Sequence, residues 1–319
     1  MRRYLVTGGA GFIGSHLSAA LVAQGADVVV LDDLSQGVRE RVPAMAEFVE
    51  GCVSDIDLLK DLLVDADGCF HLAAITDSAC SGRELAAAHR VNQVGTLAVF
   101  NAARRTLAAP CPVVWASSAA VYGEKPRDAL EESSATLPIS PYGVDKFSSE
   151  VYARTLAKQY SFNNVALRLF NVFGPGQLHR RCISGVIPNL LNQLSDGHPF
   201  IIHGDGHQVR DFVYVSDVVN AFISSMRMIV SGSITGFEIY NVCRGHGISI
   251  LGLVELISDM LGKDIEIHFE TDAPSGVQFS VGDSKKIFTD AGWSSETSLL
   301  DGMIATLKEE FPGLLSFRR

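Results

Sequence analysis

A tyrosine and a lysine lie four positions apart in the stretch PYGVDK, residues 141–146. Pro141 disfavours helix at Ser140, and apolar residues after Tyr142 recur at helical spacing, so a helix is predicted to begin here. Tyr142 and Lys146 would then project from one face. A nearby ammonium favours the phenolate, so we expect the pKa of the Tyr142 phenol to fall toward neutrality and the phenolate to act as a base. The alternative is an ordinary surface pair.

Consecutive serines, Ser117 and Ser118, occur in WASSAAVYG, residues 115–123. They follow a predicted strand over residues 112–116, and doubly wound sheets place their ligands at the carboxyl ends of strands. A serine hydroxyl at this edge could share a substrate proton with Tyr142. The serines therefore favour an acid–base site over a surface pair.

A glycine-rich turn, VTGGAGFIGSHL, lies between the first predicted strand and the first predicted helix. The spacing of Gly8, Gly11 and Gly14 allows a tight turn and close approach of the backbone to a pyrophosphate at the helix N-terminus. Asp32 ends the second predicted strand, where it would accept hydrogen bonds from both ribose hydroxyls and repel a 2′-phosphate. The pattern predicts dinucleotide binding, with NAD favoured over NADP.

The elements that carry these motifs alternate between strand and helix. Strands are predicted over 4–7, 27–31, 68–72, 112–116 and 165–170, and helices over 15–24, 57–63, 85–107 and 142–160. Repeated βαβ units predict an α/β fold, a Rossmann-type doubly wound parallel sheet. After Asn171 loops rich in Gly and Pro interrupt this rhythm, which predicts a smaller C-terminal lobe.

The composition narrows the classes of function. With 319 residues, 47% of them apolar, the chain is expected to be globular, and its net charge of −10 without a Lys/Arg run argues against nucleic acid and anionic lipid as partners. No apolar run approaches the ~20 residues of a membrane span. The six cysteines show no paired spacing and no signal peptide is evident, so a cytoplasmic protein with reduced thiols is expected. His203 and His207 flank a Gly-Asp-Gly turn without an evident third ligand, so no metal is expected.

With these motifs in order, the sequence resembles the extended short-chain dehydrogenase/reductase family, and within it the nucleotide-sugar epimerases of the UDP-glucose 4-epimerase type. The resemblance runs along nearly the whole chain, through TGGAGFIGSHL, LDDLSQG, HLAA, VNQVGT, SSAAVYG, PYGVDK, RLFNVFGPGQ, GDGHQVRDFVYVSDV, YNV and AGW. It implies an isomerase with tightly bound NAD⁺. Tyr142 would remove the proton of the sugar C4 hydroxyl while the C4 hydride passes to the nicotinamide, and the 4-keto sugar would take the hydride back on its other face.

The resemblance also implies a role for individual residues. Ser118, Tyr142 and Lys146 would be catalytic, and Ser118, Asn171 and Arg210 would bind the substrate, most simply a UDP-sugar. The implied cofactor-binding residues are Gly8, Gly11, Phe12, Ile13, Gly14, Asp32, Asp55, Leu72, Ala73, Ala74, Asn92, Tyr142 and Lys146. Two assignments have an alternative, since Asp55 could instead cap the next helix and Arg210 could instead pair with a neighbour such as Asp211.

The expected domain division follows from the same resemblance. Residues 1–168 would form the NAD-binding domain, with a return of the chain to it around 209–243, and residues 169–319 would mainly form the nucleotide-sugar-binding lobe. The apolar stripes of the helices at 85–109 and 142–160 would pair across a two-fold axis in a homodimer, unless both face the chain's own sheet.

The sequence departs from the family pattern in three places. Cys52 replaces a usual Asp near the adenine, and Ala273 replaces a usual arginine that clamps the diphosphate, for which Arg180 or Arg181 would have to substitute. Ala119 and Ala120 replace the Asp–Glu pair of the related sugar dehydratases, which disfavours that reaction. A related reductase or decarboxylase stays open as an alternative, as does a non-catalytic NAD-sensing protein. Neither the sugar nor the base of the nucleotide is fixed by the sequence.

Overall fold

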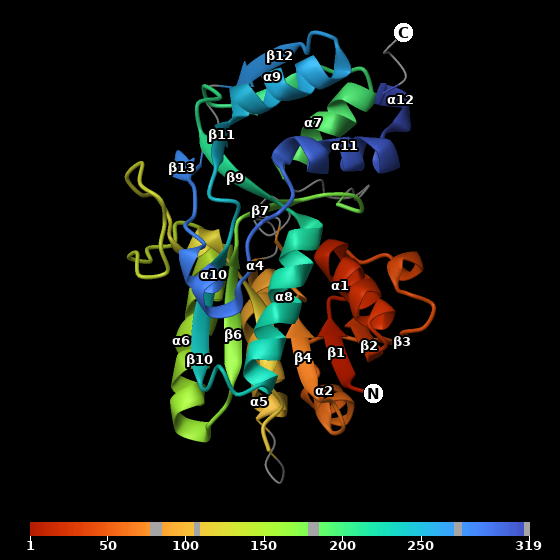
Figure 1. Ribbon diagram of the computed structural model, residues 1–319, viewed down its shortest axis with the longest axis vertical. Helices are drawn as coiled ribbons and strands as arrows, with labels where there is room; N and C mark the ends of the chain where they lie inside the picture. The colour runs from red at the N-terminus through yellow and green to blue at the C-terminus, as the bar shows by residue number, and fades with distance from the viewer. Residues whose placement is uncertain (77–84, 105–108, 178–184, 271–275, 316–319) are drawn as a thin grey trace.

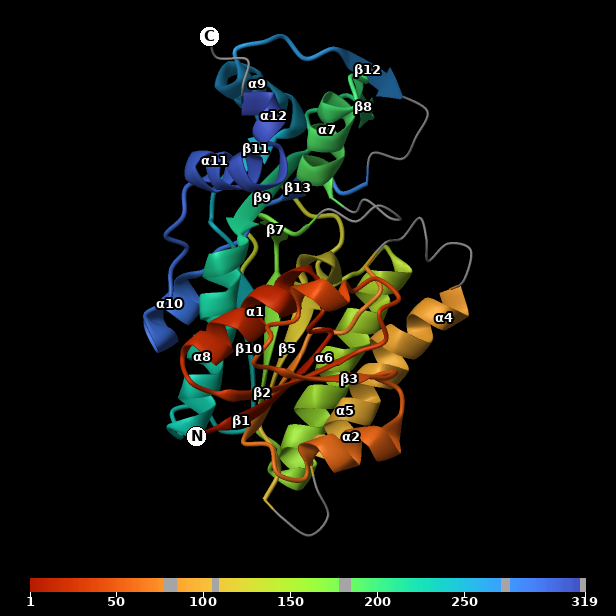
Figure 2. The same ribbon diagram turned by 90° about the vertical axis from the view of Figure 1, so that its right-hand side faces the viewer.

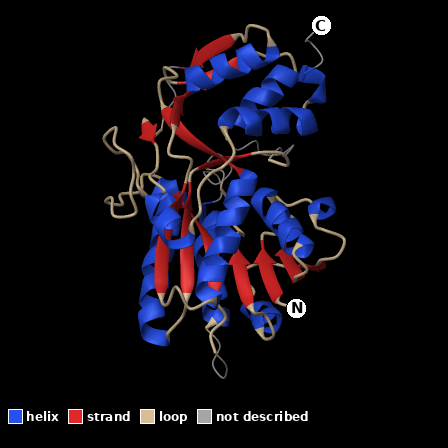
Figure 3. Ribbon diagram, viewed as in Figure 1, coloured by secondary structure: helices blue, strands red, loops and turns tan. Residues whose placement is uncertain are grey.

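The computed structural model describes residues 1–76, 85–104, 109–177, 185–270 and 276–315. Its larger sheet has seven parallel strands in the order β10-β6-β5-β4-β1-β2-β3 (Figures 1 and 3). The strands are β1 (Arg3–Thr7), β2 (Asp27–Asp32), β3 (Glu47–Glu50), β4 (Gly68–His71), β5 (Val113–Ser118), β6 (Asn164–Leu169) and β10 (Phe237–Val242). The predicted Rossmann-type α/β fold is confirmed. The sequence analysis missed β3, a short, partly exposed edge strand without an apolar run.

Helices cover both faces of this sheet, as Figure 2 shows. One face packs against α1 (Phe12–Ala23) and α8 (Val215–Val230), and the other against α2 (Ile56–Leu63), α5 (Thr96–Ala103) and α6 (Pro141–Tyr160). A parallel sheet covered on both faces needs strands that are apolar on both sides, which is why β2 reads DVVVLD and β5 reads VVWASS. The two apolar layers hold the sheet rigid, so the carboxyl ends of its strands form a fixed edge.

The predicted helix over 85–107 is interrupted. It consists of α4 (Leu85–His89), a π-helix (Arg90–Gly95) and α5, which ends at Ala103. Six residues of π-helix are unusual, and such segments are frequent at functional sites. Here the wider turn directs Asn92 and Gln93 into the protein, where both side chains are buried.

The second lobe stands above the carboxyl edge of the large sheet (Figure 1). Its strand β9 (Val209–Tyr214) pairs with β7 (Asn171–Phe173), β11 (Gly247–Ser249) and β13 (Phe279–Ser280), while β8 (Phe200–His203) pairs with β12 (Ile267–Glu270). The helices α7 (Val186–Ser195), α9 (Ile250–Leu261), α11 (Leu299–Glu310) and α12 (Pro312–Leu315) belong to this lobe. Its apolar core is separate from those of the sheet.

Two segments late in the chain lie beside the large sheet. Strand β10 forms one edge of it, and α10 (Lys285–Ala291) packs against β10. In the described ranges no helix is both long and apolar enough to cross a membrane.

The aromatic cluster under α5 generates a stability prediction. Phe100 is fully buried, with ring centroids 5.5 Å from Trp115 and 5.7 Å from Phe162. Phe100→Ala would leave a cavity that this tight packing cannot fill, so we expect the free energy of unfolding to fall by about 3–5 kcal/mol. Urea denaturation followed by circular dichroism measures it.

Phe288→Ala is the matched control, because that side chain is 59% exposed on α10. Its expected effect is under about 0.5 kcal/mol. Equal losses in the two variants would contradict the assignment of Phe100 to the core.

Candidate active site

A cavity of about 660 Å³ lies where the strands of the large sheet end and the second lobe begins. Its walls include most of the residues that the sequence analysis selected: Gly8, Gly11, Phe12, Ile13, Gly14, Asp32, Leu72, Ala73, Ala74, Ser118, Tyr142, Lys146 and Asn171. The strands β1 and β4 are neighbours, but the chain continues from β1 to β2 on one side and from β4 to β5 on the other, and doubly wound folds bind ligands where the strand order reverses in this way. The volume suits an extended small-molecule ligand.

The glycine loop between β1 and α1 leaves no room for side chains. A Cβ on Gly14 would lie 2.1 Å from the carbonyl oxygen of Gly8, and one on Gly8, whose φ is +71°, would lie 2.6 Å from the nitrogen of Ala73. Gly11 is the N-cap of α1, where no side chain caps the first amides. Those N–H groups and the positive end of the helix dipole are suited to a pyrophosphate.

Asp32, at the end of β2, is held by backbone donors. Its Oδ2 accepts a hydrogen bond from the N–H of Ala10 at 3.0 Å and its Oδ1 accepts one from Leu34 at 2.9 Å. Burial raises the pKa of the Asp32 carboxyl, and these two hydrogen bonds oppose that rise. Each oxygen keeps a lone pair that a ribose hydroxyl can use, while a phosphate at the same place would be repelled. The loop and Asp32 therefore fit NAD.

Helix α6 starts where the sequence analysis placed it. Ser140 is its N-cap and accepts a hydrogen bond from the N–H of Gly143 at 3.1 Å. A Cβ on Gly143 would lie 2.7 Å from the carbonyl oxygen of Ala120, so the helix approaches the end of β5 closely. This approach brings Tyr142 to Ser118.

The predicted trio of Ser118, Tyr142 and Lys146 lies together. Ser118 interacts with the Tyr142 phenol closely enough to lower its pKa against the effect of burial. Lys146 Nζ lies 5.6 Å from the centroid of the Tyr142 ring. Ser118 Oγ also accepts a hydrogen bond from the N–H of Ala120 at 3.1 Å. Lys146 is only 1% exposed, so its charge acts in a medium that screens it weakly. A phenol, a hydroxyl and an ammonium thus converge on one point of the cavity.

The expected fall of the Tyr142 pKa toward neutrality is wrong for the protein chain alone. Burial raises the pKa of Tyr142 to about 12, and the hydrogen bond with Ser118 only partly opposes this. Burial also lowers the pKa of Lys146 to about 8, against the charge of Asp145. The error arose because the sequence shows a neighbouring cation but does not show that both groups are desolvated.

A buried histidine joins the glycine loop to the π-helix, and the sequence analysis missed it. His71 Nδ1 lies 2.7 Å from Thr7 Oγ1, and His71 Nε2 lies 2.9 Å from Thr96 Oγ1. Thr96 already donates its hydroxyl proton to the carbonyl oxygen of Asn92, so His71 Nε2 must donate to Thr96 and Nδ1 must accept from Thr7. Burial and the charge of Lys146 lower the pKa of His71 to about 3, which keeps the ring neutral.

Three of the selected residues do not line the cavity. Asn92 uses its carboxamide to bind the N–H and the carbonyl of Ile75, at 2.8 and 2.9 Å, and so supports a segment that does line it. Asp55 is exposed and caps α2, with its Oδ1 accepting from the N–H of Asp57 and of Leu58 at 3.1 Å. Arg210, on β9, donates to the carbonyl of Val209 at 2.9 Å.

The alternative pairing of Arg210 with Asp211 is not formed. The Asp211 carboxylate instead accepts hydrogen bonds from the backbone N–H groups of Arg244, Gly245 and Gly282. Arg180, Arg181 and Ala273, on which the expected diphosphate clamp depends, lie outside the described residues.

Several side chains of the second lobe close the cavity and were not anticipated. They come from the β7–α7 segment and from β9: Gln177, Val186, Ile187, Pro188 and Phe212. Their types are ordinary for a folded core, so no signal in the sequence separates them from structural residues.

The glycine loop generates a prediction about cofactor binding. Gly14→Ala places a methyl group against the Gly8 carbonyl, so the loop must open and its amides lose their alignment. We expect affinity for NAD to fall by at least about 100-fold, which corresponds to roughly 2.7 kcal/mol. Titration calorimetry with NAD measures the change.

Gly313→Ala is the control, since a Cβ there meets no atom within 4 Å. Unaltered NAD affinity in Gly14→Ala would show that the cofactor does not rest on this loop.

Comparison with known proteins agrees with this site. Residues 4–243 match the family described as NAD dependent epimerase/dehydratase family. The UDP-glucose 4-epimerase of Azospirillum brasilense is 31% identical, over 95% of this chain and 90% of its own. Among solved structures, UDP-glucose 4-epimerase from Thermotoga maritima with UDP-glucose superposes with a TM-score of 0.90 at 32% identity, covering 98% of this chain and 99% of the other.

A second solved structure, a UDP-N-acetylglucosamine 4-epimerase from Methanobrevibacter ruminantium in complex with UDP-N-acetylmuramic acid, has a TM-score of 0.89, 32% identity and coverage of 98% and 99%. These matches confirm the resemblance to the epimerase group and the expected cofactor class. This chain belongs to the NAD-dependent epimerase/dehydratase family.

Proposed function

We propose that this protein is a nucleotide-sugar 4-epimerase that uses a tightly bound NAD. The observation that carries the proposal is that Ser118, Tyr142 and the buried Lys146 lie together at the wall of a cavity that the glycine loop also lines. A base and a dinucleotide site in one cavity are what oxidation of an alcohol requires.

Tyr142, Ser118 and Lys146 each have a separate role in the proposed reaction. NAD, when bound, supplies the acceptor and later the donor of a hydride at the sugar C4, and its positive ring adds to the field that favours the phenolate. Tyr142 takes the proton of the C4 hydroxyl and returns it when the opposite epimer forms. Ser118 holds the same hydroxyl and stabilises the phenolate by a hydrogen bond, while the ammonium of Lys146 compensates its charge in the buried wall.

A UDP-sugar is the substrate that the comparisons favour, because the UDP-glucose and UDP-N-acetylglucosamine 4-epimerases match this chain over nearly its full length. Asn171 lines the cavity on the side of the second lobe. We assign it to the diphosphate together with Arg210, since a protein of net charge −10 must supply local positive charge to a diphosphate. In this proposal residues 1–168 and 209–243 bind NAD, and the rest of 169–319 binds the nucleotide sugar.

Other reactions of the family are the second candidate. Ala119 and Ala120 have no group that transfers protons, so elimination of water through a pair at these positions does not occur. A reductase or decarboxylase would keep Ser118, Tyr142 and Lys146. A reductase would leave the cofactor oxidised after each turnover, and a decarboxylase would release CO2 from a uronic acid. An epimerase retains NAD through turnover and releases no CO2, and these two observations separate the three reactions.

We further propose that the protein is a cytoplasmic homodimer. Val144, Val151 and Tyr152 form an exposed apolar stripe on α6, and Leu85 and Val94 are exposed on the neighbouring α4 and π-helix. Apolar side chains 45–53% exposed on adjacent helices are suited to pairing with a second copy.

The activity prediction concerns Tyr142. Purified protein without added cofactor is expected to interconvert C4 epimers in a panel of UDP- and dTDP-sugars, and Tyr142→Phe is expected to lose at least about 100-fold in kcat because no proton acceptor remains. Chromatographic separation of the epimers measures both.

The variant should still carry NAD, which is checked by releasing the cofactor from the denatured protein. Wild-type activity in Tyr142→Phe would show that Tyr142 is not the base. Absence of epimer formation with every sugar, together with net oxidation or reduction of NAD, would favour the second candidate.

The dimer prediction concerns the apolar stripe. Val151→Glu places a charge at its centre, where Val151 is 52% exposed, so the pair of helices would have to bury an unpaired carboxylate. Sedimentation velocity is expected to give a dimer for the wild type and a monomer for the variant.

Val64→Glu is the control, because Val64 is 63% exposed at the end of α2, away from the stripe. A monomeric wild type, or a dimer that survives Val151→Glu, would contradict this interface.

A further inference from the structure

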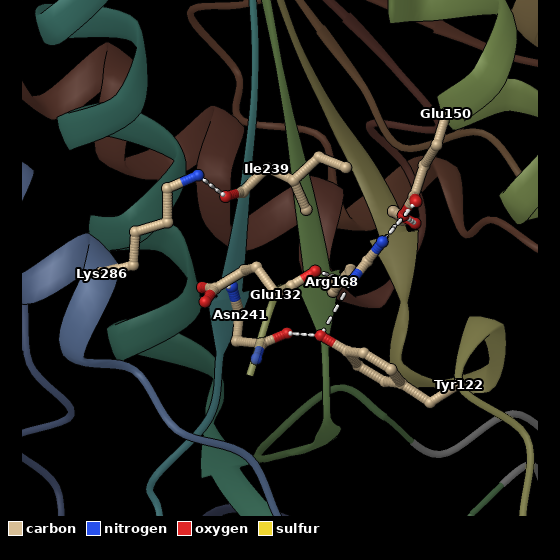
Figure 4. Close-up of polar contacts among 8 residues, drawn as sticks. Tyr122, Glu132, Glu150, Arg168, Ile239, Asn241 and Lys286 are labelled. Carbon is tan, nitrogen blue, oxygen red and sulfur yellow. Dashed lines mark hydrogen bonds and ion pairs between the residues drawn. The ribbon is translucent and has the colours of Figure 1, made fainter. Parts of the chain in front are cut away.

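Behind the catalytic trio, one ion pair is buried between α6 and the large sheet. Arg168 donates from Nη2 to Glu150 Oε2 at 2.7 Å and from Nε to Glu150 Oε1 at 2.9 Å. Both side chains are at most 4% exposed. Figure 4 shows the two groups meeting between the helix and the strands. A two-pronged contact of this kind fixes the orientation of both partners as well as their distance.

The guanidinium is anchored on its other side too. Arg168 Nη1 donates to the hydroxyl of Tyr122 at 2.9 Å and to the carbonyl oxygen of Glu132 at 3.2 Å, and Tyr122 in turn donates to Asn241 Oδ1 at 2.6 Å (Figure 4). Burial would lower the pKa of Arg168, but the hydrogen bonds and the charge of Glu150 outweigh it and raise that pKa. Glu150 is therefore held in place from the sheet, and through Glu150 this part of α6 is fixed against the sheet.

The hydroxyl of Ser117 connects this ion pair to the active site. Ser117 donates from Oγ to Glu150 Oε1 at 2.6 Å, and Ser117 is the residue next to Ser118 on β5. Ser117 and Arg168 are also direct partners in the β5–β6 pairing. On the helix side, Glu150 follows Lys146 by four residues and Tyr142 by eight, so the three lie on one stripe of α6.

We propose that Ser117 is a positioning residue, which ties the last residues of β5 to Glu150 of α6 and so keeps Ser118 within hydrogen-bond reach of Tyr142. The inference rests on the proposed function, since it assigns a task to the same site. Ser117 does not touch the reacting atoms in this account. Ser117 acts by fixing the position of the end of β5 relative to α6. The two elements also contribute Trp115 and Ala153 to one apolar cluster.

The consequence is chemical, because the interaction with Ser118 lowers the pKa of Tyr142 against the effect of burial. When Ser118 moves away, the phenolate loses a stabilising partner and forms only at higher pH. The acid limb of the kcat profile, which reports the ionisation of the base, then moves to higher pH.

Ser117→Ala tests the proposal with little structural damage. It removes one hydroxyl and leaves the Glu150–Arg168 pair intact, whereas Glu150→Gln would leave a buried guanidinium without its counter-charge and endanger folding. We expect kcat to fall roughly tenfold with KM unchanged, since misplacement of a catalytic group by about 1 Å costs up to ~100-fold. The acid limb is expected to shift upward by about half a pH unit or more.

Ser149→Ala is the matched control. Ser149 lies beside Glu150 on the same helix and is fully buried. Its hydroxyl proton is shared between Gln93 Oε1 at 2.8 Å and the carbonyl oxygen of Asp145 at 2.9 Å, and neither acceptor is on β5. We expect its melting temperature to drop about as much as that of Ser117→Ala, with kcat and the pH profile unchanged. Wild-type kinetics in Ser117→Ala, or an equal loss in Ser149→Ala, would overturn the positioning role.

A second readout does not need turnover. The ionisation of Tyr142 can be followed by phenolate absorbance in the NAD-loaded protein without substrate, as the difference from Tyr142→Phe. Ser117→Ala should raise the midpoint of this titration and Ser149→Ala should not. If the wild type epimerises none of the sugars, the proposed function fails, and this titration still decides whether Ser117 controls the contact between Ser118 and Tyr142.

Discussion

Helix α6 brings charged groups into the apolar interior on one stripe, and the architecture of the site depends on how those charges are compensated. Tyr142, Lys146 and Glu150 follow each other at four-residue spacing on the face that packs on the sheet. The carboxylate is matched by the guanidinium of Arg168, which the sheet itself supplies. The ammonium remains only partly compensated, and burial lowers the pKa of Lys146 to about 8. Arg168 of the sheet therefore neutralises Glu150 at one end of the stripe. The charge of Lys146, nearer to Tyr142, remains able to stabilise an anion.

The same burial explains why the chain alone does not hold an ionised tyrosine. Desolvation penalises the phenolate, and the pKa of Tyr142 is raised to about 12 although a lysine lies one turn away. In the proposed epimerase, Tyr142 would stay protonated until the positive ring of bound NAD adds its charge to the cavity. Ionisation of the proposed base would then be restricted to the cofactor-loaded protein.

Features that a short stretch of sequence determines could be predicted, whereas features that depend on contacts between distant residues could not. The glycine loop, Asp32 and the Tyr142–Lys146 spacing are local patterns, and the structure brings them together at one edge because parallel strands all end there. Asn92 was selected by resemblance, yet it supports Ile75, and Asp55 forms the helix cap that was the alternative to its contact with the cofactor. The Arg168–Glu150 contact joins positions 18 residues apart through strand register and helix packing, which no local pattern contains. The depth of burial, and hence the direction of the Tyr142 pKa, is likewise a property of the assembled fold.

The neutral ring of His71 connects the end of β1 to the π-helix side of the cavity through hydrogen bonds and adds no charge. Its ring spans from Thr7, the last residue of β1, to Thr96 on the π-helix side, and Thr96 and Asn92 connect it to Ile75. A protonated imidazole at this place would repel Lys146, and burial together with Lys146 holds the pKa of His71 near 3. Polar links on one side of the trio and an internally neutralised ion pair on the other thus flank Lys146, whose Nζ lies 5.6 Å from the centroid of the Tyr142 ring. In the proposed reaction, rigid placement and a nearby positive charge are the conditions under which Tyr142 would serve as a base.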